Sequence, residues 1–234
     1  MSRRSVDQSV SFAGYRFPPD LILLAVRWYL RYGLSYRDVE ELLAERGIDV
    51  DHVTIYRWVQ RFTPLLIDAA RPCRHSVGDR WFVDETYVKV AGVWRYVYRA
   101  VDQYGQVIDV YVSKRRNLTA ARTFFAMVLA SHHRPEEVIT DLAPSLLRVV
   151  DELLPDALHD TDQYSNNRIE NDHGRLKARL RPMRGLQTDP TASVVIRGHA
   201  FMQNLRRGHY ELGVEARHER LRVAAAFDEL AQAI

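Results

Sequence analysis

Hydrophobic residues recur every three or four positions along the first part of the chain, a spacing that predicts three short helices. The first spans Asp20 to Tyr32, the second follows Ser35 and ends at Gly47, and the third follows Asp51. Ser35 and Asp51 suit the starts of helices because their side-chain oxygens can accept backbone N–H groups of the first turn. We therefore predict a three-helix domain over residues 18–66.

Beyond residue 79 the pattern changes to the alternation of β-branched and aromatic residues that is typical of strands. The first three strands are joined by tight turns, which predicts an antiparallel meander. A helix that follows Asn117 separates them from the fourth strand, which we expect to join the sheet in parallel after this crossover. The predicted strands span residues 80–90, 93–101, 107–113, 137–141 and 158–161.

The predicted order of elements is three strands, a helix, a strand, a helix, a short strand and a helix, which is the order of an RNase H-like core. The fold class is thus α/β: an N-terminal helical domain, a mixed-sheet core and C-terminal helices. The expected divisions are a loose tail (1–17), the three-helix domain (18–66), a linker that contains Pro72 (67–79), the core (80–210) and a C-terminal helix (211–234).

Composition limits the possible functions only in part. A hydrophobic content of 47% in 234 residues can form a real core, and a net charge of +3 is too small to establish nucleic-acid binding. Cys73 is the single cysteine, which excludes an intrachain disulfide and a thiolate zinc site. We find no signal peptide and no apolar run long enough to span a membrane, so we expect a cytoplasmic protein without a membrane partner.

The third predicted helix has a polar and basic outer face, which makes the N-terminal domain a helix-turn-helix candidate. Its outward positions are Thr54, Arg57, Gln60 and Arg61. Such side chains can contact base edges or phosphates from the major groove of DNA. The alternative is an ordinary three-helix domain with a solvated polar face.

Three acidic residues stand at positions that suit a metal site. Asp84 lies within the first strand of the core, Asp141 ends the fourth, and Glu170 lies on a helix crowded with cations, among them Arg175 and Lys177. Oxygen ligands on separate elements can hold two Mg²⁺ ions beside a phosphate, while the cations suit a phosphate-bearing polymer. Singly, Asp84 would also fit a surface acid, Asp141 a helix cap and Glu170 an ion pair with Lys177 or Arg175.

The residue next to Asp84 is also acidic, but strand geometry argues against its taking part. Successive side chains of a strand point to opposite faces of the sheet. We therefore expect Glu85 to face away from the site, and we expect Asp102, Asp109 and Asp172 to be structural or solvated.

Several motifs resemble the DDE transposases of the insertion-sequence "six" family. They are V-D-E-T-Y-V-K-V with W-R-Y-V-Y-R-A-V-D, the T-D-x-A-P at Asp141, and S-N-N-R-I-E-N-D-H-G-R-L-K at Glu170. The segments A-V-R-W-Y-L-R-Y-G-L-S-Y-R-D-V-E and D-H-V-T-I-Y-R-W-V-Q-R-F are similar to that family's helix-turn-helix region. The resemblance covers about Phe17 to Arg207, nearly the whole chain.

The resemblance implies that Asp84, Asp141 and Glu170 are catalytic metal-binding acids for two Mg²⁺ or Mn²⁺ ions, and that Lys177 contacts DNA. It also implies binding of double-stranded DNA at terminal inverted repeats, joining of a 3′ end to target DNA, and formation of cointegrates by replication. We expect a homo-oligomer, at least a dimer, on DNA.

The chain departs from the family at two points. Only 28 residues separate Asp141 from Glu170, fewer than is usual, and Leu142 stands where the family tends to have Lys. Three functions therefore stay open: an active transposase, a DNA-binding relative that has lost catalysis, and an RNase H-like nuclease that cuts without joining. The sequence does not define the repeat, the target preference, the number of subunits or the role of the C-terminal helix.

Overall fold

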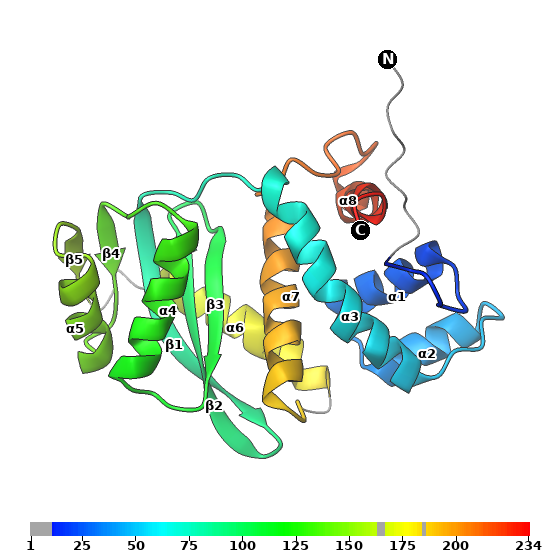
Figure 1. The fold of residues 1–234 in the computed structure, drawn as a ribbon, viewed down its shortest axis with the longest axis horizontal. Coiled ribbons are helices and arrows are strands. Elements are labelled where there is room, and N and C mark those ends of the chain that lie inside the picture. The colour runs from blue at the N-terminus through cyan, green and yellow to red at the C-terminus, as the bar shows by residue number, and fades with distance from the viewer. Residues whose placement is uncertain (1–10, 163–166, 184–185) are drawn as a thin grey trace. The chain divides into compact units, whose positions relative to one another are not determined.

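The computed structural model describes residues 11–162, 167–183 and 186–234, and the chain divides into two compact units. The first combines the N-terminal segment up to Arg74 with Gly208–Ile234, and the second comprises His75–Arg207. Figure 1 shows four helices of the first unit, α1, α2, α3 and α8, and the mixed sheet of the second.

The first unit contains the three predicted helices, α1 (Pro19–Arg31), α2 (Tyr36–Ala44) and α3 (His52–Ala70). Both predicted caps are present. The Ser35 hydroxyl accepts the Asp38 N–H at 3.2 Å while the Asp38 carboxylate accepts the Ser35 N–H at 2.6 Å. The Asp51 carboxylate accepts the N–H groups of residues 53 and 54, both at 2.9 Å. These bonds satisfy donors that the first turn of each helix would otherwise leave unpaired.

Part of the predicted loose tail is packed instead. Phe12 is buried and stacks on Phe62 of α3 with ring centroids 4.7 Å apart, and Tyr15 contacts the same ring at 5.3 Å. Phe17 meets Trp58 at 5.3 Å. The prediction was wrong from residue 12 onward because it gave weight to the polar residues of this segment and not to its three aromatic side chains, whose ring contacts with α3 stabilise the ordered backbone. Residues 1–10 lie outside the described residues.

The predicted linker also begins as helix. α3 continues through Pro64 to Ala70 and is followed by a 3-10 turn, Arg71–Cys73. Pro64 removes one backbone hydrogen bond. Phe62, Leu66 and Ala70 nevertheless continue the buried side of the helix at four-residue spacing, and all three are fully buried. The apolar stripe thus extends the helix four residues past the predicted boundary at residue 66.

The C-terminal helix is shorter than the predicted 211–234. A 3-10 turn, Glu219–Leu221, leads into α8 (Arg222–Ala231), whose Val223, Ala226, Phe227 and Leu230 are buried. The preceding segment folds back, with Gly213 in the left-handed region at φ 64° and its N–H donated to the Glu229 carboxylate at 3.0 Å. A tight turn at this glycine replaces the predicted first turns of the helix.

Replacing Gly213 by Ala should destabilise the first unit. A Cβ at Gly213 would lie 2.2 Å from the backbone carbonyl oxygen of Arg222, so the turn must move away from α8. The matched control is Gly47→Ala, since Gly47 also has positive φ, 71°, but its Cβ would meet nothing within 4 Å. We expect the control to lower the free energy of unfolding by about 1 kcal/mol and Gly213→Ala by at least about twice that. Equal losses in chemical denaturation would contradict the predicted clash.

The second unit contains a five-stranded mixed sheet in the order β3-β2-β1-β4-β5. The pairs β1–β2 and β2–β3 are antiparallel and β1–β4 is parallel, as predicted, and β4–β5 is also parallel. All five predicted strands are present. Their bounds are β1 (Arg80–Val90), β2 (Val93–Asp102), β3 (Val107–Ser113), β4 (Glu137–Ile139) and β5 (Leu158–Asp160).

Helices cover both faces of the sheet. α4 (Leu118–Ser131) and α5 (Pro144–Leu153) enclose a hydrophobic core, in which Trp81 and Tyr98 of the sheet pack with Phe124 and Leu146. α6 (Asn167–Leu180) crosses β1 and β2 on the opposite face, next to α7 (Asp189–Arg207), which lies along β3. The predicted caps for α6, Ser165 and Asn166, lie outside the described residues. Asp84 on β1 and the helix α6 that crosses β1 are therefore both held in place by the packed sheet and helices.

Candidate active site

A cluster of three carboxylates lies at the centre of the sheet. Within the described part of the chain, Asp84, Glu85 and Asp141 each offer an oxygen, and these oxygens all lie within 4.8 Å of one another. The Asp84 side chain is 17% exposed, that of Glu85 2% and that of Asp141 42%. The cluster is therefore open to solvent on the side of Asp141.

The parallel pairing of β1 with β4 explains why Asp84 and Asp141 meet. Phe82 is paired with Ile139, the last residue of β4. Asp84 and Asp141 each follow these partners by two residues, so they stay opposite each other where the chains separate. Asp141 also accepts the Ala143 N–H at 3.0 Å, which fixes the turn into α5.

Glu85 was expected to face away, and its carboxylate joins the cluster instead. β1 pairs with β4 only as far as Phe82, and its next partner along this edge is Leu186, which bridges Val90. Among the described residues, Asp84 and Glu85 thus have no partner strand on this edge, which lets the Glu85 carboxylate approach the other two. Arg116, in the loop before α4, forms an ion pair with Glu85 and places a guanidinium nitrogen 3.8 Å from Asp141. Arg116 lies in a loop, where no periodic pattern of residues indicates its position, so the sequence analysis did not identify it.

The crowding of negative charge perturbs the site. Burial raises the pKa of Asp84 to about 7, and the nearby charges of Asp141 and Glu85 raise it further against the attraction of Arg116. Burial also raises the pKa of Glu85 in spite of Arg116. The ionised forms of Asp84 and Glu85 are thus disfavoured in the folded protein, and a divalent cation bound by the three carboxylates would stabilise them.

Glu170 lies on α6 and is exposed, outside this cluster. The helix nevertheless passes the site, because Nδ1 of His173 lies 3.6 Å from the Asp84 carboxylate. Residues three apart on a helix have Cβ atoms about 5–6 Å apart, which places Glu170 one turn from that contact. Lys177 and Arg175, the other candidates on this helix, are exposed as well.

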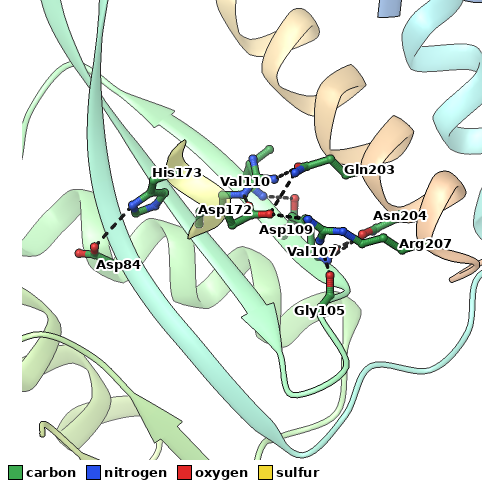
Figure 2. Close-up of polar contacts among 11 residues, drawn as sticks. Asp84, Gly105, Val107, Asp109, Val110, Asp172, His173, Gln203, Asn204 and Arg207 are labelled. Atoms are coloured by element: carbon green, nitrogen blue, oxygen red, sulfur yellow. Dashed lines mark hydrogen bonds and ion pairs between the residues drawn. The ribbon is translucent and has the colours of Figure 1, made fainter. Parts of the chain in front are cut away.

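A buried polar network holds α6 on the sheet (Figure 2). Asp172 is 2% exposed and forms an ion pair with Arg99 of β2, which is fully buried. Figure 2 shows Asp172 between Gln203 and Arg207. Gln203 and Arg207 of α7 both donate to Asp172 at 3.0 Å. Burial alone would raise the pKa of Asp172, but Arg99 and Arg207 outweigh it and lower the pKa. Asp172 is therefore structural, as one of the sequence alternatives held, and its neighbour His173 is directed toward Asp84.

His173 is kept neutral by its surroundings. Burial lowers its pKa to about 4, and the positive charge of Arg99 acts in the same direction. A neutral imidazole beside Asp84 adds no positive charge to the carboxylate cluster.

The candidate DNA-reading residues of α3 differ in accessibility. Arg57 and Arg61 are exposed one turn apart, whereas Thr54 and Gln60 are half-buried. The Thr54 hydroxyl donates to the capping carboxylate of Asp51 at 2.8 Å, so Thr54 has a local structural role. Of these four side chains, the two arginines are therefore the more accessible to a ligand outside the domain.

The strand order and the central carboxylates define an RNase H-like enzyme core of the kind predicted. A family model described as a DDE domain (DDE_Tnp_IS240) matches residues 78–209, more than half of the chain. The transposase for insertion sequence-like element IS431mec of Staphylococcus aureus is 40% identical over 179 residues, covering 74% of this chain and 80% of that protein. The same values hold for the transposase for insertion sequence element IS257 in transposon Tn4003, also from Staphylococcus aureus. The chain belongs to the insertion-sequence "six" family of DDE transposases.

Among solved structures, the catalytic core domain of HTLV-2 integrase in complex with magnesium is similar, with a TM-score of 0.45 and 18% identity. The match covers 63% of this chain and 97% of that domain. Within the described residues, none of the helices is long and apolar enough to cross a membrane.

Proposed function

We propose that this transposase binds the terminal inverted repeats of its element and catalyses metal-dependent DNA cleavage and strand transfer, with cointegrates formed by replication. The observation that carries the proposal is the carboxylate cluster of Asp84, Glu85 and Asp141, whose oxygens lie within 4.8 Å of one another. Asp84, Asp141 and Glu170 are the proposed catalytic acids, and two Mg²⁺ or Mn²⁺ ions are the proposed cofactors.

The donor set suits this cofactor. Mg²⁺ binds hard oxygen ligands, which the cluster supplies. Burial and, after it, the charges of Asp141 and Glu85 raise the pKa of Asp84, and a bound cation would favour its ionised form. When bound, paired divalent cations lower the pKa of the attacking hydroxyl and stabilise the leaving 3′ oxygen. Asp84 and Asp141 would hold them from the sheet, and Glu170 would approach from α6. Arg116 pairs with Glu85 and makes a longer contact, 3.8 Å, with Asp141, so we propose that it holds Glu85 aside while Asp84 and Asp141 bind the ions.

The cations on α6 would bind the DNA backbone next to the acids. Lys177 lies seven residues after Glu170 on the same face of the helix, and Arg175 is exposed nearby. Their contacts to phosphates would fix the position of the strand but would carry no sequence information. Because two ends of an element must be joined, each needing a set of acids, we propose that at least two copies act together on DNA.

In the N-terminal unit, the exposed side of α3 is the proposed reader of the repeat. Arg57→Ala should weaken repeat binding roughly tenfold, with or without divalent metal, because it removes a base-edge or phosphate contact worth about 1–3 kcal/mol. Fluorescence anisotropy with labelled repeat DNA measures this affinity. The matched control is Arg46→Ala, which removes an exposed arginine that lies over Trp28 at the end of α2. Equal affinities for Arg57→Ala and wild type would exclude α3 as the reader.

Strand transfer with the element's own repeat DNA and Mg²⁺ tests the proposed reaction. Joined products support the proposal, cutting without joining supports a nuclease, and binding without chemistry supports an inactive DNA-binding relative. The structure bears on the last alternative through the short spacing between Asp141 and Glu170. α5 and β5 both fit within it, and β5 pairs with β4 in register. The sheet thus accommodates the shorter connection, which favours the active enzyme.

A further inference from the structure

The hairpin of β1 and β2 carries two large aromatic side chains that face solvent. Tyr87 is 54% exposed and Trp94 48%. The turn between the strands is formed by Ala91 and Gly92, both with positive φ, 48° and 77°, which is the backbone of a tight two-residue hairpin. Figure 1 shows the tip of this hairpin projecting past the end of β4. Rigid aromatic surface at such a position is available to a ligand.

Two lysines lie over these rings. Nζ of Lys177 is 4.6 Å from the ring centre of Tyr87, and Nζ of Lys89 is 4.8 Å from that of Trp94. The two rings meet at right angles with their centres 4.9 Å apart. Ammonium groups beside exposed aromatic faces suit a ligand that is both anionic and flat, which is the chemistry of a nucleotide.

Stabilisation of the hairpin alone does not explain this arrangement. The packing of Tyr87 against Trp94 would be explained by the stability that a cross-strand aromatic pair gives to a hairpin. It does not account for Lys177, which reaches Tyr87 from α6, a different element. The two lysines also disfavour an apolar protein partner, because docking would remove both charges from water without an anion to pair them.

Tyr87, Trp94, Lys89 and Lys177 together form an aromatic and basic patch. This patch lies close to the proposed catalytic acids. Tyr87 follows Asp84 by three residues on β1, about 10 Å at roughly 3.3 Å per residue. Lys177 follows Glu170 by seven residues on α6, also about 10 Å at 1.5 Å per residue. A strand bound at the acids would therefore present its next few nucleotides to the hairpin.

We infer that Tyr87 and Trp94 form a stacking site for an unpaired base of the DNA strand held at the carboxylates, with Lys89 and Lys177 contacting its phosphates. The inference rests on the proposed function and adds to it: the substrate is recognised partly as unstacked, single-stranded DNA next to the reacting phosphate. Stacking is tolerant of sequence because every base has a π face. The site would thus favour an opened DNA end without defining its sequence.

Binding of a short oligothymidylate to the full-length protein in EDTA tests the inference without catalysis. Stacking should quench tryptophan emission, because Trp94 is 48% exposed, whereas Trp58 and Trp81 are buried and Trp28 is half-buried. By anisotropy of labelled oligothymidylate, Trp94→Leu and Tyr87→Leu should each lose about tenfold in affinity, as expected for one lost stacking contact. Trp94→Phe and Tyr87→Phe, which keep an aromatic face, should stay within about threefold of wild type.

Tyr104→Leu is the matched control, since Tyr104 is 71% exposed at the other end of β2 and outside the patch. Its affinity should equal that of wild type. The inference is overturned if the leucine variants bind as wild type, if the phenylalanine variants lose as much as the leucine variants, or if wild-type emission does not change on binding. Oligothymidylate binding is measured in EDTA and strand transfer in Mg²⁺, so failure of the proposed chemistry and failure of the stacking site give different results.

Discussion

Asp84→Asn should lower strand transfer at least about a thousandfold, equivalent to about 4 kcal/mol in the activation free energy. The substitution keeps the size of the side chain and removes the charge at the centre of the carboxylate cluster. An amide is a poor ligand for Mg²⁺ compared with a carboxylate, so the cofactors would be lost or misplaced. Asp141→Asn should have the same effect, because its carboxylate lies opposite Asp84, two residues after the end of β4.

Loss of folding would not explain this result. The raised pKa of Asp84 means that its ionised form is disfavoured in the folded protein, so stability falls as the pH rises from the ordinary carboxyl range toward 7. Asn remains neutral, and Asp84→Asn without metal should melt at or above the wild-type temperature. Asp156→Asn removes the same charge from an exposed turn and should keep full activity. More than a tenth of wild-type activity in Asp84→Asn would remove this residue from the mechanism.

The second large effect is expected from Asp172→Asn, which should lower the free energy of unfolding by about 3–5 kcal/mol. Arg99 is fully buried, and Asp172 is its carboxylate partner. Without that charge the guanidinium stays buried and uncompensated. The double variant Arg99→Met with Asp172→Asn should recover part of the loss, because it leaves no buried cation at residue 99.

Urea denaturation measures this effect, and Asp189→Asn is its control. Asp189 pairs with Arg95, but the side chains are 29% and 18% exposed, so the loss should stay near 1 kcal/mol. The pKa of Asp172 is lowered on folding, so its contribution is present at neutral pH and is lost on acidification below about pH 4. Similar losses for both variants at neutral pH would contradict the role of Asp172 in anchoring α6.

The sequence predicted the framework well where local chemistry decides it. The capping box at Ser35, the cap at Asp51 and the alternation that gives β1 depend on neighbouring residues, and all were confirmed. The parallel pairing of β4 followed from the crossover rule. The errors came from tertiary packing: Phe12 is ordered by Phe62, and α3 continues past Pro64 because of its buried stripe.

The candidate site was predictable only where it depends on the order and pairing of the strands. Asp84 and Asp141 meet because strand register brings them together, which the order of elements already indicated. Glu85 joins them through an open strand edge, which depends on how short β4 is, and Arg116 comes from a loop without any periodic signal. The roles of Asp84, Asp141 and Glu170 in catalysis stay predictions, and Glu170 in particular lies on α6 outside the observed cluster.

The most direct test is a crystal structure of the protein with terminal repeat DNA and Mn²⁺, with the ions located by anomalous scattering. We predict manganese between the carboxylates of Asp84 and Asp141, with the Glu170 carboxylate turned inward to complete the site and Glu85 still paired with Arg116. Manganese held by Asp84, Glu85 and Asp141 with Glu170 directed to solvent would contradict the assignment of the third acid. Manganese bound away from Asp84 and Asp141 would contradict the proposed site as a whole.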